Sequence, residues 1–159
     1  MKKVILGATG SIGSSLAKKL VDSGEQVHLV GRDEGSLSEL ANELNSTFTT
    51  CDVLEENFSE KIINDLKDEQ VNGLAYCVGS IDLKPLKLTK KSDFMQSFNL
   101  NLVSATEIIK SLADNLKSLF TSLYIKLKFF DLSSSLNDLI EDKNNNIFNL
   151  WCFSKVHNP

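Results

Sequence analysis

The sequence is poor in cysteine, has no excess of positive charge and contains no long apolar run. Its three cysteines, Cys51, Cys77 and Cys152, are odd in number and form no CxxC pair, so the sequence predicts neither a metal site nor a dithiol redox motif. Reduced thiols in a cytoplasmic compartment fit this pattern best. The 17 Lys and Arg residues against 21 Asp and Glu give a net charge of −4, which argues against binding nucleic acid through a basic face.

No stretch approaches the roughly 20 apolar residues that a membrane-spanning helix needs, so no membrane partner is predicted. The segment Met1-Lys2-Lys3 could begin a signal peptide, but Gly7 interrupts the apolar run after Leu6 and leaves it too short for one. A length of 159 residues with 42% hydrophobic content is typical of one domain with a buried core.

Strand and helix patterns alternate from the first residue. Strands are predicted at 3–6, 26–30, 47–53 and 73–78, and helices at 14–23, 37–44, 58–66 and 92–117. Phe94, Phe98, Leu102, Ala105, Ile109 and Leu112 are expected to line the buried face of the last helix. Because a βαβ unit needs roughly 30 residues, the chain should hold about five strands. The fold class is therefore α/β, a Rossmann-type doubly wound parallel sheet in a single domain spanning 1–159.

The loop between the first strand and the first helix reads Gly7-Ala8-Thr9-Gly10-Ser11-Ile12-Gly13, a GxxGxxG variant of the dinucleotide-binding fingerprint. Gly7 permits the tight turn, Gly10 lets the backbone approach a pyrophosphate, and Gly13 lets the helix pack close to the sheet. The N–H groups at the start of that helix can then bind phosphate. We expect a dinucleotide at Gly7, Thr9, Gly10, Ser11, Ile12 and Gly13. The alternative is a tight turn without a ligand.

The end of the second strand bears on which dinucleotide binds. An NAD site has Asp or Glu here to accept from the ribose 2′-hydroxyl. This chain instead has Gly31, which leaves room, and Arg32, whose guanidinium can bind a 2′-phosphate. We therefore expect NADP(H) to be preferred over NAD(H). Asp33 leaves an alternative open, because its carboxylate could take the hydroxyl or pair with Arg32.

In order and spacing, four landmarks over residues 1 to about 115 resemble the short-chain dehydrogenase/reductase family, especially its 3-oxoacyl-carrier-protein reductase-like members. The glycine loop is similar to the family's TGxxxGxG, with Ser11 at the middle glycine. Cys51-Asp52-Val53 resembles the Asp-Val pair that reaches the adenine amino group. Tyr76-Cys77-Val78-Gly79 stands in the place of an Asn-Asn-Ala-Gly turn, of which only Gly79 is kept. Phe98-Asn99-Leu100-Asn101-Leu102 resembles the "VNL" segment.

The resemblance implies site residues. Asp52, Val53 and Gly79 would line the cofactor site, and Asn101 would be the counterpart of the asparagine in the catalytic tetrad. Loss of both asparagines of the turn removes side chains that normally stabilise the central sheet near the cofactor. The resemblance also implies a homo-oligomer that pairs through the 92–117 helix.

The family's catalytic Ser, Tyr and Lys have two placements in this sequence. Tyr124-Ile125-Lys126-Leu127-Lys128 has the YxxxK spacing, but the alternation of apolar residues around it predicts a strand instead of the required helix. The second placement takes 126–132 as the fifth strand, Ser134 as the serine and Lys155 as the lysine. Trp151 then occupies the place of the tyrosine, and an indole N–H is not an acid at neutral pH.

The region 117–159 is expected to be a divergent or truncated tail after a well-matched cofactor half at 1–116, because the chain stops at Pro159, where the catalytic helix should continue. The predicted function is an NADP(H)-dependent oxidoreductase of a small carbonyl or alcohol, with a compromised catalytic half. The alternative is a non-catalytic dinucleotide-binding module or sensor, or the remnant of an interrupted gene.

Overall fold

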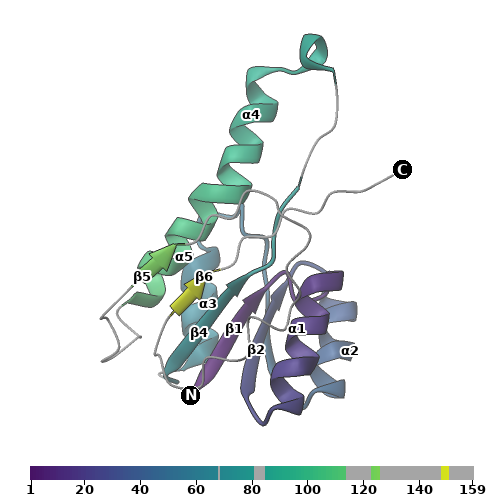
Figure 1. Cartoon of the computed structure of the whole chain (residues 1–159), viewed down its shortest axis with the longest axis vertical. Coiled ribbons are helices and arrows are strands. Elements are labelled where there is room, and N and C mark those ends of the chain that lie inside the picture. Colours follow the sequence, from purple (N-terminus) through teal and green to yellow (C-terminus); the bar gives the residue numbers. More distant parts are fainter. Residues whose placement is uncertain (68, 81–84, 114–122, 126–147, 151–159) are drawn as a thin grey trace.

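Strands and helices alternate along the chain in the computed structural model, which describes residues 1–67, 69–80, 85–113, 123–125 and 148–150 (Figure 1). The elements are β1 (Lys2–Leu6), α1 (Ser11–Asp22), β2 (Gln26–Gly31), α2 (Glu34–Glu43), β3 (Thr47–Thr50), α3 (Phe58–Leu66), β4 (Val71–Tyr76), a 3-10 turn η1 (Leu86–Leu88), α4 (Lys91–Phe98), a π-helical turn η2 (Asn99–Val103), α5 (Ser104–Ala113), β5 (Leu123–Ile125) and β6 (Phe148–Leu150).

Four strands form one parallel sheet in the order β3-β2-β1-β4. Leu6, the last residue of β1, pairs with Val30 of β2 and Tyr76 of β4, so these strands end side by side. We call this end of the sheet the carboxyl edge and the opposite end the amino edge. The predicted α/β class is confirmed. The expected fifth strand at 126–132 lies outside the described residues, and β5 and β6 form a separate parallel pair.

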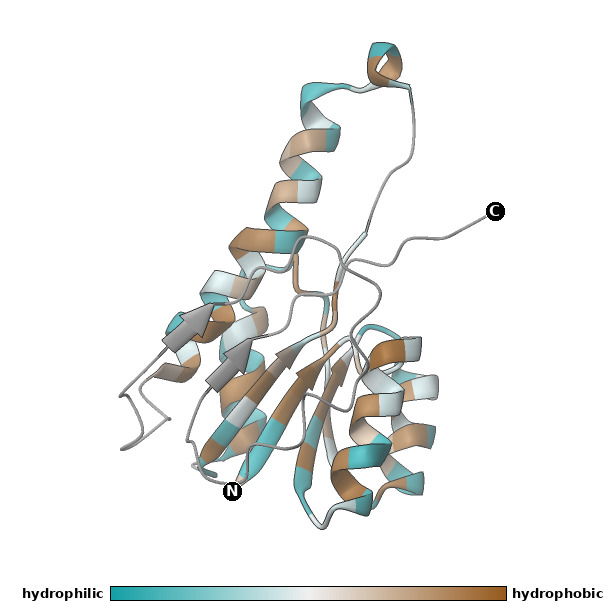
Figure 2. Cartoon of the chain, in the orientation of Figure 1, coloured by the Kyte–Doolittle hydropathy of each residue, from teal (hydrophilic) through white to brown (hydrophobic). Residues whose placement is uncertain are grey.

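Each face of the sheet is covered by helices, which makes the fold doubly wound (Figures 1 and 2). Successive residues of β1 point to opposite faces, as in any strand. One core, which includes Val4 and Leu6, packs against α3 and α5, whereas the other, which includes Ile5, packs against α1 and α2. The fully buried residues of β1 are Val4, Ile5 and Leu6, as expected for a central parallel strand.

Two predicted strands have different bounds in the structure. β3 ends at Thr50 instead of Val53, because the chain turns after Cys51, where the amide of Glu55 donates to the carbonyl of Asp52. β4 spans Val71–Tyr76 instead of 73–78, and its residues Asn72, Gly73 and Ala75 are only half-buried. Cys51 and Val53 are nevertheless buried, so their apolar character reflects core packing beyond the end of a strand.

The predicted 92–117 helix is continuous over its described part, Lys91–Ala113, but its expected buried face is only half correct. Phe94 is 57%, Phe98 54% and Leu102 40% exposed, because α4 projects beyond the sheet (Figure 1). The π-helical turn η2 takes one more residue than an α-helical turn, which rotates the apolar face after it. Ile108 is consequently the fully buried isoleucine of α5.

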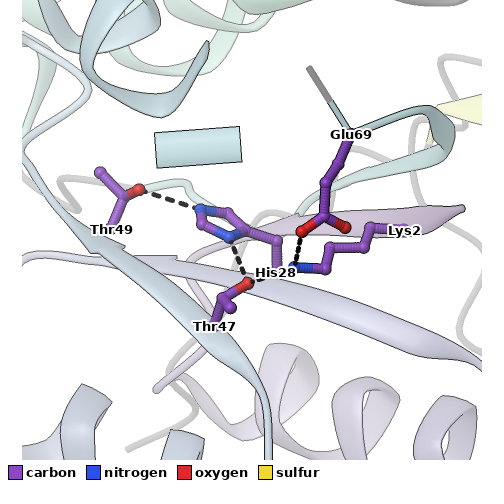
Figure 3. Close-up of polar contacts among 5 residues, drawn as sticks. All are labelled: Lys2, His28, Thr47, Thr49 and Glu69. Carbon is purple, nitrogen blue, oxygen red and sulfur yellow. Dashed lines mark hydrogen bonds and ion pairs between the residues drawn. The ribbon is translucent and has the colours of Figure 1, made fainter. Parts of the chain in front are cut away.

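A polar network lies at the amino edge, beneath α3 (Figure 3). Fully buried His28 of β2 bonds through Nδ1 to the hydroxyl of Thr47 at 2.8 Å and through Nε2 to the hydroxyl of Thr49 at 2.9 Å. Thr49 donates to Asp65 at 2.6 Å. Since its single hydroxyl proton is used there, Nε2 carries the histidine proton and donates to Thr49, and Nδ1 accepts from Thr47.

Lys2 completes this amino-edge network. Its ammonium group donates to Thr47 at 3.0 Å and to Glu69 at 2.7 Å (Figure 3). Burial and then the positive charge of Lys2 lower the pKa of His28 from 6.5 to about 4, against smaller opposing effects of the Asp65 and Glu69 carboxylates. The histidine is therefore neutral at pH 7, and the hydrogen bonds of its ring are satisfied within the protein.

Candidate functional site

The glycine loop leaves the carboxyl edge between the ends of three strands. The amides of Gly7 and Ala8 both donate to the carbonyl of Val30 at 2.9 and 3.0 Å, which ties the loop to the end of β2. Gly7 has a φ of +75°, in the region that favours glycine. A Cβ on Gly7 would lie 2.7 Å from the carbonyl oxygen of Cys77, just after β4. No larger residue fits at this position.

The start of α1 packs directly on this loop. A Cβ on Gly13 would overlap the carbonyl oxygen of Gly7 and lie 2.9 Å from Cα of Ala8, so only glycine allows the close approach. α1 begins at Ser11, and Gly10 precedes it in an extended conformation without a side-chain cap. The first turn of α1 contains no acidic residue. The amide end of this helix is therefore free of the side-chain groups that would compete with a bound anion.

Arg32 and Asp33 follow β2 and have different partners. Nη1 of Arg32 lies 3.5 Å from Oδ2 of Asp52. Asp33 caps α2, because its side chain accepts from the amide of Ser36 at 2.8 Å. The hydroxyl of Ser36 and, to a smaller extent, this amide lower the pKa of Asp33 through their hydrogen bonds. The suggested pairing of Asp33 with Arg32 is therefore replaced by an Arg32–Asp52 pair. Aspartate just before a helix was the sequence signal for this cap.

Asp52 and Val53 follow the carboxyl end of β3. Oδ1 of Asp52 accepts from the amide of Leu54 at 3.0 Å, which holds the carboxylate in a local turn. Val53 is buried, and its carbonyl accepts from the hydroxyl of Ser104 at 2.8 Å. The burial of Cys51 beside them raises the pKa of its thiol to about 11, helped by the nearby carboxylate of Glu55, so this thiol is protonated and unreactive at pH 7.

Gly79 lies in the segment after β4, next to Ser80, which Asn101 contacts. Gly79 is half-buried in the turn that follows the strand. Nδ2 of Asn101 donates to the carbonyl of Ser80 at 3.3 Å and to the carbonyl of Ser97 at 2.8 Å. The structure thus places the π-helical turn η2 against the same edge of the sheet as the glycine loop.

The carboxyl edge brings together most of the residues predicted for the site. The glycine loop, Arg32, the Asp52-Val53 pair and Gly79 follow β1, β2, β3 and β4 in turn. Ser134 and Lys155 lie outside the described residues. Tyr124 lies in strand β5, as the apolar alternation around it predicted.

A shallow open hollow beside the glycine loop contains residues that the sequence did not single out. It is lined by Thr9, Ser14, Ser36, Glu39, Leu40 and Glu43, from the loop, α1 and α2. Glu43 is paired with Lys18 at 2.7 Å. Ser14 and Ser36 had no distinguishing pattern in the sequence, because their place beside Thr9 depends on how α1 and α2 pack.

The described residues include neither a metal-binding cluster nor a membrane-spanning helix. Within that part of the chain, no group of three or more His, Cys, Asp or Glu residues is arranged to hold a metal ion. Over the same residues, every helix is too short or too polar to cross a membrane.

Sequence comparison agrees with this geometry. The family model described as short chain dehydrogenase matches residues 2–121. The chain belongs to the short-chain dehydrogenase family. The match covers β1–β4 and all the helices described here, which includes the whole carboxyl edge of this dehydrogenase-family chain.

Individual relatives are more distant. L-fucose dehydrogenase of Oryctolagus cuniculus is 31% identical over 111 residues, which are 67% of this chain and 39% of that protein. An uncharacterized oxidoreductase of Staphylococcus epidermidis is 46% identical over 43 residues, or 27% of this chain and 19% of that protein. This short-chain dehydrogenase-family chain therefore spans less than half of the curated relatives it matches.

Solved structures share the fold. Serine dehydrogenase from Escherichia coli superposes with a TM-score of 0.65 at 21% identity, over 73% of this chain and 56% of that one. The closed form of serine dehydrogenase complexed with NADP+ gives a TM-score of 0.67 at 21% identity, over 73% of this chain and 49% of that one. These likenesses establish the Rossmann-type architecture of the family member described here.

Proposed function

We propose that this chain binds a nicotinamide dinucleotide at the carboxyl edge and prefers NADP(H) over NAD(H). The glycine loop is the observation that carries the proposal. Side chains at Gly7 or Gly13 would strike backbone, and the helix end beyond them has no side-chain cap. Such a helix end binds phosphate through its N–H groups and its positive dipole end. The residues assigned to the pyrophosphate are Gly7, Thr9, Gly10, Ser11, Ile12 and Gly13.

The preference for NADP(H) rests on Arg32. Its side chain is 78% exposed, and it contacts Asp52 at 3.5 Å, a distance that leaves the guanidinium able to turn toward a 2′-phosphate. Asp33 is already used as the cap of α2, which weakens the alternative in which it accepts from a ribose hydroxyl. Asp52 and Val53 would contact the adenine, and Gly79 would lie near the other end of the dinucleotide.

The proposed reaction is reduction of a small carbonyl, or oxidation of the corresponding alcohol. The bound dinucleotide supplies or accepts the hydride. This chain's residues must bind the substrate and deliver a proton to its oxygen, for which Asn101, Ser134 and Lys155 are the candidates. The 3-oxoacyl thioesters are the substrate class that the sequence resemblance implies.

Proton delivery is the weak step. The chain has two tyrosines. Tyr76 is fully buried and donates its hydroxyl hydrogen to the carbonyl of Leu100, and Tyr124 lies in a strand. The family's proton donor sits on a helix, four residues before a lysine. This observation favours a compromised catalytic half and keeps a non-catalytic dinucleotide-binding module as the second candidate.

Calorimetric titration with NADPH and NADH tests the cofactor proposal. NADPH should bind more tightly than NADH. Arg32→Ala should lower the affinity for NADPH on the order of tenfold and leave the affinity for NADH almost unchanged. The expected factor is modest because the side chain is exposed to solvent. Equal affinities for the two cofactors in the parent protein would overturn the preference.

NADPH oxidation against small ketones and acetoacetyl thioesters separates the two candidates. General acid catalysis is typically worth about 10²- to 10⁴-fold, so turnover should be at or near background despite cofactor binding. Robust turnover that Tyr124→Phe abolishes would contradict this expectation.

We also propose that the chain pairs with a second copy through α4 and works in the cytoplasm. Phe94, Met95 and Phe98 are each about half exposed on α4 and form an apolar surface that a copy of the same helix could cover. The buried free thiol of Cys51 suits a reducing compartment. Sedimentation velocity should give a dimer, and a monomer at tens of micromolar would contradict the pairing.

A further inference from the structure

The π-helical turn η2 (Asn99–Val103) is held by hydroxyl groups. The hydroxyl of Tyr76 donates to the carbonyl of Leu100 at 2.6 Å. The hydroxyl of Ser104 lies 2.8 Å from the carbonyl oxygen of Val53 and 3.0 Å from that of Asn99, and its one proton is shared between these two acceptors. A π-helical turn is rare, and it disturbs the regular i→i−4 pairing of a helix. These side-chain hydrogen bonds therefore stabilise the π-helical turn relative to the regular α-helix that the same residues could form.

Tyr76 connects this turn to the sheet. It is the last residue of β4, its side chain is fully buried, and its hydroxyl reaches a carbonyl 24 residues further along the chain. Asn101 follows Leu100 and donates to the carbonyl of Ser80. The π-helical turn thus contacts Tyr76 at the end of β4 and Ser80 in the segment that follows it. The residues between these contacts, 77–79, form the turn beside the glycine loop.

The position of that turn matters for the loop. The carbonyl oxygen of Cys77 is the atom that a Cβ on Gly7 would approach to 2.7 Å, so the two backbones are already in close contact. The amide of Cys77 also donates to the carbonyl of Leu6, immediately before Gly7, at 2.9 Å. A small displacement of residues 77–80 must therefore displace the start of the glycine loop.

We infer that Tyr76 is a positioning residue: its hydroxyl fixes the π-helical turn and, through Asn101, holds residues 77–80 against the glycine loop. The expected effect of Tyr76 on cofactor affinity rests on the proposed dinucleotide site. Its effect on the position of residues 77–80 does not depend on that proposal. Tyr76 replaces the first asparagine of the turn that the family resemblance leads one to expect. The hydroxyl of Tyr76, at the end of β4, connects the sheet to the π-helical turn through its hydrogen bond to Leu100.

Tyr76→Phe is the first test, because it keeps the ring and removes only the hydroxyl. Hydrogen–deuterium exchange should become faster in both 77–80 and 99–104. NADPH affinity should fall by about three- to tenfold, as expected for one lost hydrogen bond. Thr49→Val is the matched control, since it removes a hydrogen-bonded hydroxyl at the amino edge, from the same sheet. Thr49→Val should lower the stability of the fold about as much as Tyr76→Phe does. It should nevertheless leave hydrogen exchange at 77–80 and the affinity for NADPH unchanged.

A double-variant comparison tests whether Tyr76 acts through Asn101. Asn101→Ala should also accelerate exchange at 77–80, and the double variant should show no further increase over Asn101→Ala alone. Additive effects, or unchanged exchange at 77–80 in Tyr76→Phe, would overturn the inference. If the parent protein binds no dinucleotide, the proposed function fails and the exchange results still decide the role of Tyr76.

Discussion

Both edges of the sheet carry polar groups, but the groups are arranged in opposite ways. At the amino edge, Lys2, His28 and Thr47 bond to one another inside the protein, and His28 is fully buried. At the carboxyl edge, the start of α1 has no side-chain cap, and Thr9, Gly10 and Ser11 are exposed. Polar character alone therefore does not distinguish a binding site from structural packing.

The difference lies in which groups already have partners. Buried polar groups that are mutually satisfied stabilise a fold, and those left directed outward are available to a ligand. The amino edge is closed in this sense by side chains from three strands and α3. The carboxyl edge is open, because no side chain caps the start of α1 behind the glycine loop. Substitutions at the two edges should consequently affect different properties.

Gly13→Val should have the largest effect, because its Cβ would overlap backbone of the glycine loop. We expect no measurable NADPH binding by calorimetry and a melting temperature lower by several degrees. Gly35→Ala is the control, since its Cβ would meet only Oδ1 of Asp33 at 3.7 Å, at the exposed start of α2. Alanine should leave binding intact and stabilise the helix by about 0.5–1 kcal/mol. Unchanged NADPH affinity in folded Gly13→Val would place the site elsewhere.

The amino edge should make stability depend on pH. Unfolded His28 takes up a proton near its ordinary pKa of 6.5, whereas the folded chain resists protonation until about pH 4. The unfolded state therefore binds more protons between these values, and stability falls as the pH falls through that window. The loss of stability between pH 7 and pH 4 should be about 3 kcal/mol.

His28→Gln provides the comparison, because an amide can donate to Thr49 and accept from Thr47 without titrating. Urea unfolding between pH 4 and pH 7 should give a flatter stability profile for this variant, while its NADPH affinity at pH 7 stays unchanged. Identical pH profiles for the two proteins would rule out His28 as the titrating group.

Asp33→Ala should have the smallest effect. Loss of the cap on α2 should lower the free energy of unfolding by about 1 kcal/mol. If the carboxylate serves only as a cap, the ratio of NADPH to NADH affinity should not change, and Asp33→Ser should restore stability. A selective loss of NADH affinity would instead assign Asp33 to the ribose hydroxyl.

Sequence periodicity predicted most of the fold and most of the open edge. Strands and their turn residues are local features, so the ends of β1 and β2 and the glycine loop could be located in advance. The arrangement of Arg32 with Asp52 could not, because it depends on how the loops after β2 and β3 approach each other. The cap by Asp33 had a recognisable signal that competed with its possible role in cofactor binding.

The amino-edge network and the Tyr76–Leu100 bond had no sequence signal. His28, Thr47 and Asp65 lie on separate elements and meet only after the sheet and α3 pack. The sequence correctly predicted an apolar face on α4, but the expectation that Phe94 and Phe98 are buried was wrong. Helical spacing does not indicate where along its length a helix leaves the sheet. Ser134 and Lys155 lie outside the described residues.

Titration of the chain with NADPH, followed by amide chemical shifts in NMR spectra, tests the contrast between the edges most directly. We predict that residues 7–13, 31–33, 52–53 and 77–80 shift in a saturable way, while Lys2, His28 and Thr47 do not. NADH should cause the same pattern at higher concentration. Shifts concentrated at the amino edge, or none in the folded chain at millimolar NADPH, would contradict the account.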